Sequence, residues 1–168
     1  EAKHLGLSPQ FAIYDAQDQL DLLKVVLKNL KVTKDYLAPN HARSQISYLK
    51  NKMITPDAQS RKARTILEKT VVDVYTAYQK ALKDNDALDF DDLLMKTYEM
   101  LYSNQDIANI YKEKYKYLLI DEFQDTNFIQ YSIAKLISNK TNKIFVVGDP
   151  DQSIYSWRNA DITNILNF

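Results

Sequence analysis

Two adjacent carboxylates, Asp121 and Glu122, follow a short apolar run within the stretch Lys116–Thr126. The run, Tyr117 to Ile120, contains no Gly or Pro and has the length expected of a fully buried parallel strand. In open α/β sheets, ligands bind just beyond the carboxyl ends of the strands. One carboxylate there can hold Mg²⁺, usually through water, while its neighbour orients the water that attacks a phosphate. An acidic turn after a core strand is the alternative, and the pair alone leaves both interpretations open.

A second apolar run, Lys143 to Val147, is followed by Gly148 and a polar loop that continues to Arg158. Between the two runs, Asn127 to Asn139 carries apolar residues at helical spacing. Strand, helix and strand in about thirty residues form a βαβ unit. We therefore expect both polar loops at the same edge of one sheet.

The loop after Gly148 carries four side chains that could act on a nucleotide or on nucleic acid. The amide of Gln152 cannot ionise, but it can donate a hydrogen bond to a γ-phosphate; a bond that only stabilises the loop is the alternative. Tyr155 and Trp157 are two residues apart, so in an extended segment they share a face. They could form a stacking platform for bases, or they could pack in a core. Arg158 can pair with phosphate or stack.

These two stretches resemble motifs II and III of the UvrD/Rep/PcrA-type superfamily 1A DNA helicases. The resemblance rests on the sequences Asp-Glu-Phe-Gln-Asp-Thr and Val-Gly-Asp-Pro-Asp-Gln-Ser-Ile-Tyr-Ser-Trp-Arg, and Leu88–Leu94 looks like a further motif of that family. It implies an α/β fold, a portion of a P-loop NTPase (RecA-like) parallel sheet with an inserted all-helical subdomain. One departure is Asn159, where the family usually has Gly. Asn is among the residues that tolerate positive φ best after Gly.

The resemblance also implies a function. The longer protein would use ATP and Mg²⁺ to move 3′ to 5′ along single-stranded DNA and to unwind duplexes. Asp121 and Glu122 would bind the metal, and Asp121 and Gln152 would bind the nucleotide. Glu122 would activate water, and Gln152 would report the γ-phosphate. The residues expected to contact DNA are Phe90, Tyr155, Trp157 and Arg158.

Charge and periodicity divide the chain into three parts. Residues 1–14 are expected to form a connector and a short strand of motor domain 1A, residues 15–83 a basic helical subdomain like 1B, and residues 84–168 the C-terminal part of domain 1A. Residues 24–83 hold thirteen Lys/Arg and four Asp/Glu, whereas residues 84–168 hold eight and fourteen. This division suggests phosphate-backbone contact on the basic part. A merely solvated lysine-rich surface is the alternative.

Helical spacing predicts three helices in residues 15–83. They are expected to follow Asp15 as N-cap, to run from His41 to Met53 after a break at Pro39, and to run from Pro56 to about Leu82.

The acidic segment before the next helix has two interpretations. Lys83 to Asp89 is expected to be a polar link, Asp89 can cap the helix that follows, and Asp91 and Asp92 favour its positive N-terminus. The resemblance instead places Phe90 on the path of single-stranded DNA, as a candidate base contact.

Composition sets further limits. The chain has no cysteine, so it forms neither disulfides nor thiolate metal sites, and no apolar run reaches membrane-spanning length. A cytoplasmic setting is expected, in a bacterium and near the nucleoid. Gly6 and Gly148 are the only glycines, so the phosphate loop G-x-x-x-x-G-K-[ST] is absent from these residues. With no initiator Met either, we expect an inactive fragment of a longer helicase.

The expected partners are single-stranded DNA, junctions of duplex with single strand, and the rest of the helicase chain, namely a Walker A segment and a second motor domain. Repair or replication proteins are further candidates, and a membrane is not expected. Two other functions compete: a helicase subunit of a recombination helicase–nuclease, and a catalytically silent DNA-binding or interaction module. Intact Asp121, Glu122 and Gln152 argue against the silent module.

Overall fold

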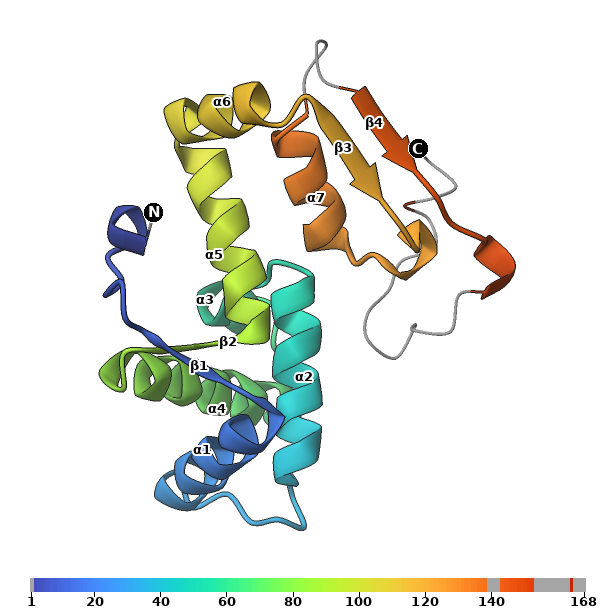
Figure 1. Ribbon diagram of the computed structural model, residues 1–168. Helices are drawn as coiled ribbons and strands as arrows, with labels where there is room; N and C mark the ends of the chain where they lie inside the picture. The colour runs from blue at the N-terminus through green and yellow to red at the C-terminus, as the bar shows by residue number, and fades with distance from the viewer. Residues whose placement is uncertain (1, 139–142, 153–163, 165–168) are drawn as a thin grey trace. The chain divides into compact units, whose positions relative to one another are not determined.

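A computed structural model describes residues 2–138, 143–152 and 164 of the protein (Figure 1). The chain is an α/β protein with two compact units, residues 1–93 and residues 94–168, each of which holds a two-stranded parallel sheet. In chain order the elements, with η for 3₁₀ helices, are η1 (Ala2–Leu5), β1 (Ala12–Tyr14), α1 (Ala16–Asn29), α2 (Pro39–Asn51), α3 (Pro56–Ser60), α4 (Ile66–Asp84), β2 (Ala87–Asp89), α5 (Phe90–Ser103), α6 (Gln105–Lys114), β3 (Tyr117–Ile120), η2 (Phe123–Asp125), α7 (Phe128–Leu136), β4 (Lys143–Val146) and η3 (Pro150–Gln152).

In the first unit, helices pack beside a short parallel sheet. β1 pairs with β2 from Ala12↔Ala87 to Tyr14↔Asp89, and Figure 1 shows the two strands side by side although four helices, α1 to α4, separate them in the chain. The longer helices α1, α2 and α4 contact one another. Apolar residues at helical spacing place their buried faces together. The core consists of Leu23, Val26, Leu27, Leu37, Ala42, Ile46, Leu49, Val71, Val74, Tyr75, Tyr78, Leu82 and Ala87.

The predicted start of the first helix is confirmed, the second helix begins two residues earlier than predicted, and the polar link predicted before Asp89 is wrong in part. Asp15 caps α1 by accepting hydrogen bonds from the N–H groups of Gln17 and Asp18. The helix predicted from His41 to Met53 after a break at Pro39 is α2, and Pro39 stands at its first position, where a helix needs no N–H from it. The link before Asp89 ends in a buried strand, β2, whose partner lies at the other end of the unit's sequence.

The single long helix predicted from Pro56 to Leu82 is also wrong, because two helices, α3 and α4, occupy this region. A capping box starts the second one. The Thr65 hydroxyl accepts from the N–H of Glu68, and the Glu68 carboxylate accepts from the N–H groups of Thr65 and Arg64. These side chains satisfy backbone donors that a continuous helix would have bonded to carbonyls one turn earlier.

The second unit contains the predicted βαβ arrangement. β3 and β4 are parallel, with pairs from Tyr117↔Lys143 to Ile120↔Val146, and α7 lies between them in the chain. The Asn127 side chain caps α7 by accepting a hydrogen bond from the Gln130 N–H, and the Asn127 N–H donates the reciprocal bond to Gln130 Oε1. The βαβ prediction is therefore confirmed for the described residues.

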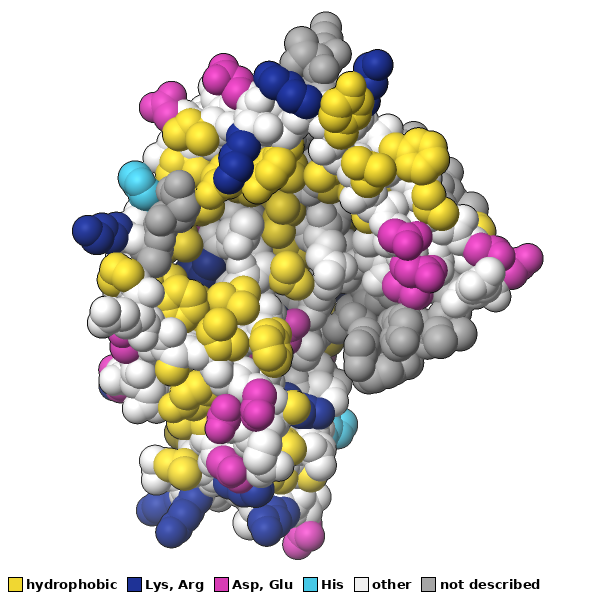
Figure 2. All heavy atoms as spheres, viewed as in Figure 1, with side chains coloured by type: hydrophobic (Ala, Val, Ile, Leu, Met, Phe, Trp, Pro, Cys, Tyr) yellow, Lys and Arg dark blue, Asp and Glu magenta, His cyan; other side chains and the backbone are white. Residues whose placement is uncertain are grey.

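The prediction that Tyr117–Ile120 is fully buried is wrong. One face of the sheet is exposed, with Tyr117 66%, Leu119 73% and Phe145 62% accessible. Hydrophobic side chains are correspondingly visible on this unit in Figure 2. The alternation of exposed and half-buried residues is that of a sheet covered on one face. Within the parts of the chain that the structure describes, no helix combines the length and the apolar character needed to cross a membrane.

Candidate active site

The backbone beyond β3 continues the hydrogen-bond ladder of the sheet. The Val147 N–H donates to the Ile120 carbonyl, and the Phe123 N–H donates to the Val147 carbonyl, both at 2.8 Å. The Phe123 ring is fully buried and meets the ring of Tyr131 in α7 edge to face, with centroids 6.0 Å apart. The loop after β3 is thus fixed to β4 at Phe123, immediately after the carboxylate pair.

Glu122 itself adopts a left-handed backbone conformation, with φ 49° and ψ 45°. A residue other than glycine in this region costs about 1–3 kcal/mol, and such residues gather at functional sites. The Glu122 N–H donates to Asp121 Oδ1 at 2.9 Å, and the buried Phe123 holds the other side of the turn. The turn leaves both carboxylates exposed at the carboxyl end of the strand.

A chain of hydrogen bonds joins the two loops. Gln124 Nε2 donates to Glu122 Oε2 at 2.7 Å, and Gln124 Oε1 accepts from the Asp149 N–H at 3.0 Å. Gln152 Nε2 in turn donates to Asp149 Oδ2 at 2.8 Å. Gln124 is only 1% exposed, whereas Gln152 lies at the surface. The two loops lie at the same edge of the sheet, as predicted, and a continuous path of hydrogen bonds joins Glu122 to Gln152 through Gln124 and Asp149.

The site is rich in oxygen ligands. Figure 2 shows acidic side chains, in magenta, gathered where β3 ends and around η3. Across the described residues, no group of three or more His, Cys, Asp or Glu side chains could enclose a metal ion. A hard cation at one or two exposed carboxylates would complete its coordination with water and with a ligand's oxygens. Mg²⁺ is usually bound in this way, through one or two carboxylates and the phosphates of a substrate.

Of the four residues predicted to contact DNA, Phe90 lies among the described residues and three do not. Tyr155, Trp157 and Arg158 lie outside the described residues, as does Asn159. Phe90 is the first residue of α5 and belongs to the first unit, where its side chain is 56% exposed.

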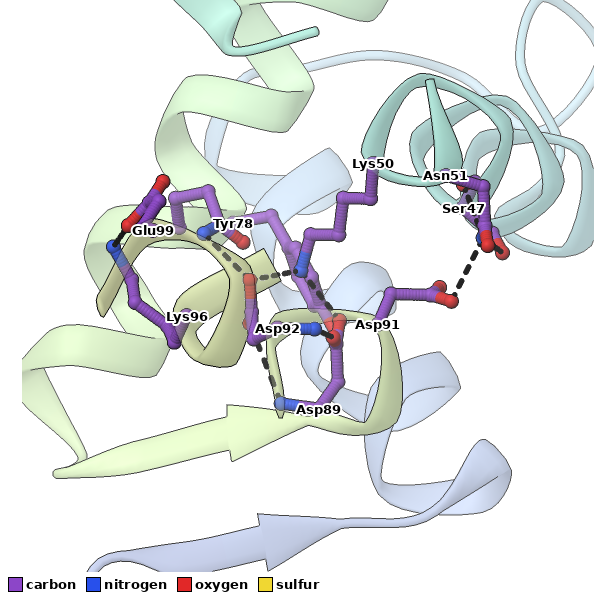
Figure 3. A network of polar contacts seen from close by, with 10 residues as sticks. Ser47, Lys50, Asn51, Tyr78, Asp89, Asp91, Asp92, Lys96 and Glu99 are labelled. Carbon is purple, nitrogen blue, oxygen red and sulfur yellow. Dashed lines mark hydrogen bonds and ion pairs between the residues drawn. The ribbon is translucent and has the colours of Figure 1, made fainter. Parts of the chain in front are cut away.

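A buried polar cluster surrounds the backbone of Phe90 (Figure 3). Lys50 of α2 is 0% exposed, and its Nζ lies 2.7 Å from Asp89 Oδ2 and 2.8 Å from Asp92 Oδ1. The Tyr78 hydroxyl donates to the same Asp89 oxygen at 3.0 Å, and Lys50 Nζ sits 5.2 Å from the centre of the Tyr78 ring. Burial raises the pKa of Tyr78 far above its usual range, so its hydroxyl remains a donor.

The other acids of the cluster are also tied to helices. Asn51 Nδ2 donates to Asp91 Oδ1 at 2.9 Å, and Gln79 Nε2 donates to Asp92 Oδ1 at 3.1 Å. Burial raises the pKa of Asp91 and of Asp92, and Lys50 opposes the rise at both. The predicted cap at Asp89 is confirmed, since Asp89 Oδ1 accepts the Asp92 N–H at 2.8 Å.

Sequence reasoning missed three residues of these two sites. Gln124 and Asp149 lie within the two motifs, but no local feature of the sequence indicates their bond, and Lys50 is one of the basic residues that suggest a phosphate-contacting surface. A signal for Lys50 was present, because Ile46, Leu49 and Lys50 are spaced as one helical face and all three are buried.

Comparison with known proteins gives one consistent result. The whole chain, residues 1–168, matches the family model described as "UvrD/REP helicase N-terminal domain". The chain is 41% identical over its full length to proteins named "ATP-dependent DNA helicase PcrA" from Staphylococcus epidermidis and from Staphylococcus aureus. It spans 23% of the length of these relatives.

Proposed function

Because the chain belongs to the UvrD/REP helicase N-terminal domain family, we propose that it is part of the motor of an ATP-dependent DNA helicase. The protein would couple hydrolysis of Mg-ATP to 3′ to 5′ movement along single-stranded DNA and to duplex unwinding. Residues 1–14 and 84–168 would contribute to a RecA-like domain, and residues 15–83 would form an inserted helical subdomain. The phosphate loop, a motif absent from these 168 residues, would come from elsewhere in a longer protein.

The observation that carries this proposal is the hydrogen-bonded path from Glu122 to Gln152. Asp121 would hold Mg²⁺, and Glu122, the next residue in the same turn, would take part in orienting and deprotonating the attacking water. When bound, the ion would neutralise charge that develops on the phosphates. Gln152 is exposed and carries an amide donor, so it can exchange its bond to Asp149 for one to a γ-phosphate.

Gln124 gives Glu122 its orientation in this scheme. Its amide is buried, and both ends are bonded, one to the Glu122 carboxylate and one to the backbone of the second loop. A carboxylate on a strained, exposed turn would otherwise sample several rotamers. Positioning of the attacking group accounts for much of the catalysis of phosphoryl transfer.

On the DNA side, Phe90 offers an exposed ring for base stacking, and we retain Tyr155, Trp157 and Arg158 as proposed contacts on the strength of their spacing. Junctions of duplex and single strand, repair or replication proteins and a bacterial cytoplasmic, nucleoid setting follow from the same proposal. A helicase subunit of a recombination helicase–nuclease would use these residues in the same way. Sequencing the gene beyond this segment separates it from a stand-alone helicase.

The deciding experiment is Glu122→Gln in the full-length protein that contains this segment. Turnover of ATP in the presence of DNA should fall about a thousandfold, while the affinity for nucleotide stays within about threefold, because the carboxylate acts on water. Glu113→Gln, a change of an exposed glutamate on α6, is the matched control and should hydrolyse ATP at the wild-type rate. A Glu122→Gln protein with normal turnover would overturn the role proposed for Glu122, whereas a wild-type protein without ATP turnover would favour the silent module.

A further inference from the structure

In the first unit, the four consecutive residues where β2 ends and α5 begins differ sharply in solvent exposure. Asp89 and Asp92 are buried, at 2% and 1% exposed, and Asp91 is half-buried, whereas Phe90 in their midst is 56% exposed. Figure 3 shows the three acids pointing toward side chains of other elements, with Lys50 and Tyr78 beside Asp89 and with Asn51 beside Asp91. The backbone on both sides of Phe90 is therefore anchored, and its ring is left to the solvent.

Lys50 closes a ring of interactions around this backbone. Asp89 and Asp92 already bond each other's N–H groups, at 2.8 Å and 3.3 Å. The ammonium group then bridges the remaining oxygens, Asp89 Oδ2 and Asp92 Oδ1. The two acids flank Phe90 within one turn, so the three groups together fix the direction in which α5 begins.

Stability alone does not account for such a cluster. Burying an ammonium group and two carboxylates removes them from water, and well-packed apolar residues in their place are often as stable or more stable. What charged, bidentate contacts add is geometric definition, since each partner tolerates only a narrow range of positions. The residue whose position this defines, and which is free to meet a ligand, is Phe90.

We propose that Lys50 is a positioning residue, which holds Asp89 and Asp92 so that the exposed Phe90 ring is preorganised to stack on a base of single-stranded DNA. The inference rests on the proposed function and extends it to a residue of α2. Preorganisation improves affinity because the ring loses less freedom on binding. Lys50 would thus affect DNA binding from a position that DNA does not touch.

A double-mutant cycle on the full-length protein tests this. The probe is a fluorescein-labelled oligo-dT at fixed salt, read by fluorescence anisotropy, with wild type, Lys50→Met, Phe90→Ala and the double variant. A stacked base contributes about 1–3 kcal/mol, so Phe90→Ala should weaken binding by roughly ten- to a hundredfold. Lys50→Met should weaken it about tenfold, and the double variant should bind no more weakly than Phe90→Ala alone. Losses that multiply in the double variant, or a Lys50→Met protein with wild-type affinity, overturn the proposal.

Two further variants separate positioning from general destabilisation. Leu27→Ala removes core volume in α1, far from the cluster in sequence, and should leave DNA affinity unchanged although it lowers the melting temperature. Tyr78→Phe keeps the ring and deletes one hydrogen bond to Asp89, so it remains informative if Lys50→Met fails to fold. Tyr78→Phe should weaken oligo-dT binding at least about twofold in the wild-type protein, and it should have no effect in a protein that already carries Phe90→Ala. Equal effects in both backgrounds overturn the positioning role.

The outcome for Phe90 itself separates this inference from the proposed function. A Phe90→Ala protein that binds oligo-dT as well as wild type overturns both the positioning role and the DNA contact at Phe90, whereas the loss of turnover in Glu122→Gln would still stand. If Phe90→Ala weakens binding and the Lys50 and Tyr78 variants do not, only the positioning role is wrong.

Discussion

Gln124 Nε2 lies 2.7 Å from Glu122 Oε2, and the other end of the same amide accepts a hydrogen bond from the Asp149 backbone. One buried side chain thus joins the carboxylate after β3 to the loop after β4. A glutamine suits this place because its amide has both a donor and an acceptor and carries no charge that would repel Glu122. A movement of the loop after β4 would therefore shift the Gln124 amide, and with it the Glu122 carboxylate, through these two hydrogen bonds.

Replacing Gln124 with Leu should lower ATP turnover of the full-length protein by about 10²-fold, the loss typical of a misplaced catalytic group. Nucleotide affinity should change little, since Gln124 is buried and both ends of its amide are bonded within the protein. Steady-state kinetics with a fluorescent nucleotide titration separates the two quantities. Gln105→Leu, at an exposed position of α6, is the control and should be neutral. A parallel loss of affinity and turnover would mean that the loop has collapsed rather than that Glu122 is misoriented.

The buried carboxyl of Asp91 gives a prediction about pH. Burial raises its pKa above the ordinary value of 3.8, with Asp89 adding to the rise and with Ser47, Asn51 and Lys50 opposing it. The folded state therefore holds this proton more tightly than the unfolded chain. The protonated Asp91 carboxyl therefore stabilises the folded state fully below pH 3.8, and this contribution is lost as the pH rises through the folded-state pKa of Asp91. At neutral pH the ionised group is a cost.

Asp91→Asn should remove that cost and keep an oxygen that can accept from Asn51. The melting temperature of the variant should exceed that of wild type at pH 7, and the difference should shrink as the pH falls toward 4. Circular dichroism melts across this range measure it. Asp73→Asn, at an exposed position of α4, should show no such trend. A variant that is less stable than wild type at pH 7 would show that the Asp91 charge is compensated in the folded state.

Sequence reasoning located the two loops of the candidate site because they depend on local features. An apolar run of strand length followed by acids identifies both a strand and its functional end, and caps such as Asp15 are read from single residues. β2 was missed because it is three residues long, and only its pairing with β1, at the far end of the unit's sequence, makes it a strand. The bond between Gln124 and Asp149 spans 25 residues and has no local signature either.

Lys50 and Thr65 are different, since their signals were in the sequence. The positions Ile46, Leu49 and Lys50 share one helical face, but lysine is so seldom buried that composition favoured the surface. Thr65 and Glu68 have the spacing of a capping box, yet the start signal at Thr55 and Pro56, with no Gly or Pro before Ile66, favoured one continuous helix.

Thr65→Ala tests whether this capping box holds the start of α4. Loss of an N-cap side chain should lower the free energy of unfolding by about 1 kcal/mol. Urea denaturation of the protein, with the slope m compared between variants, gives the value. Thr70→Ala is the matched control, because Thr70 bonds the Ile66 carbonyl from within the helix and Ala favours helices more. If Thr70→Ala lowers the free energy of unfolding as much as Thr65→Ala does, the Thr65 cap does not determine where α4 begins.

The loop from Tyr155 to Arg158 remains a prediction from spacing, and Trp157→Ala examines it. If Tyr155 and Trp157 share a face and Arg158 supplies charge beside them, loss of the indole should weaken oligo-dT binding by roughly ten- to a hundredfold in the full-length protein. DNA-stimulated ATP turnover should fall more than basal turnover, because Gln152 lies between this loop and the carboxylate pair in the sequence. Asn159→Gly should be tolerated, since glycine reaches the same backbone conformations. Anisotropy at fixed salt is the measurement, with Tyr102→Ala, which changes an exposed aromatic on α5, as the control. A folded Trp157→Ala protein with wild-type affinity would return Trp157 to the core and leave Phe90 as the proposed stacking residue.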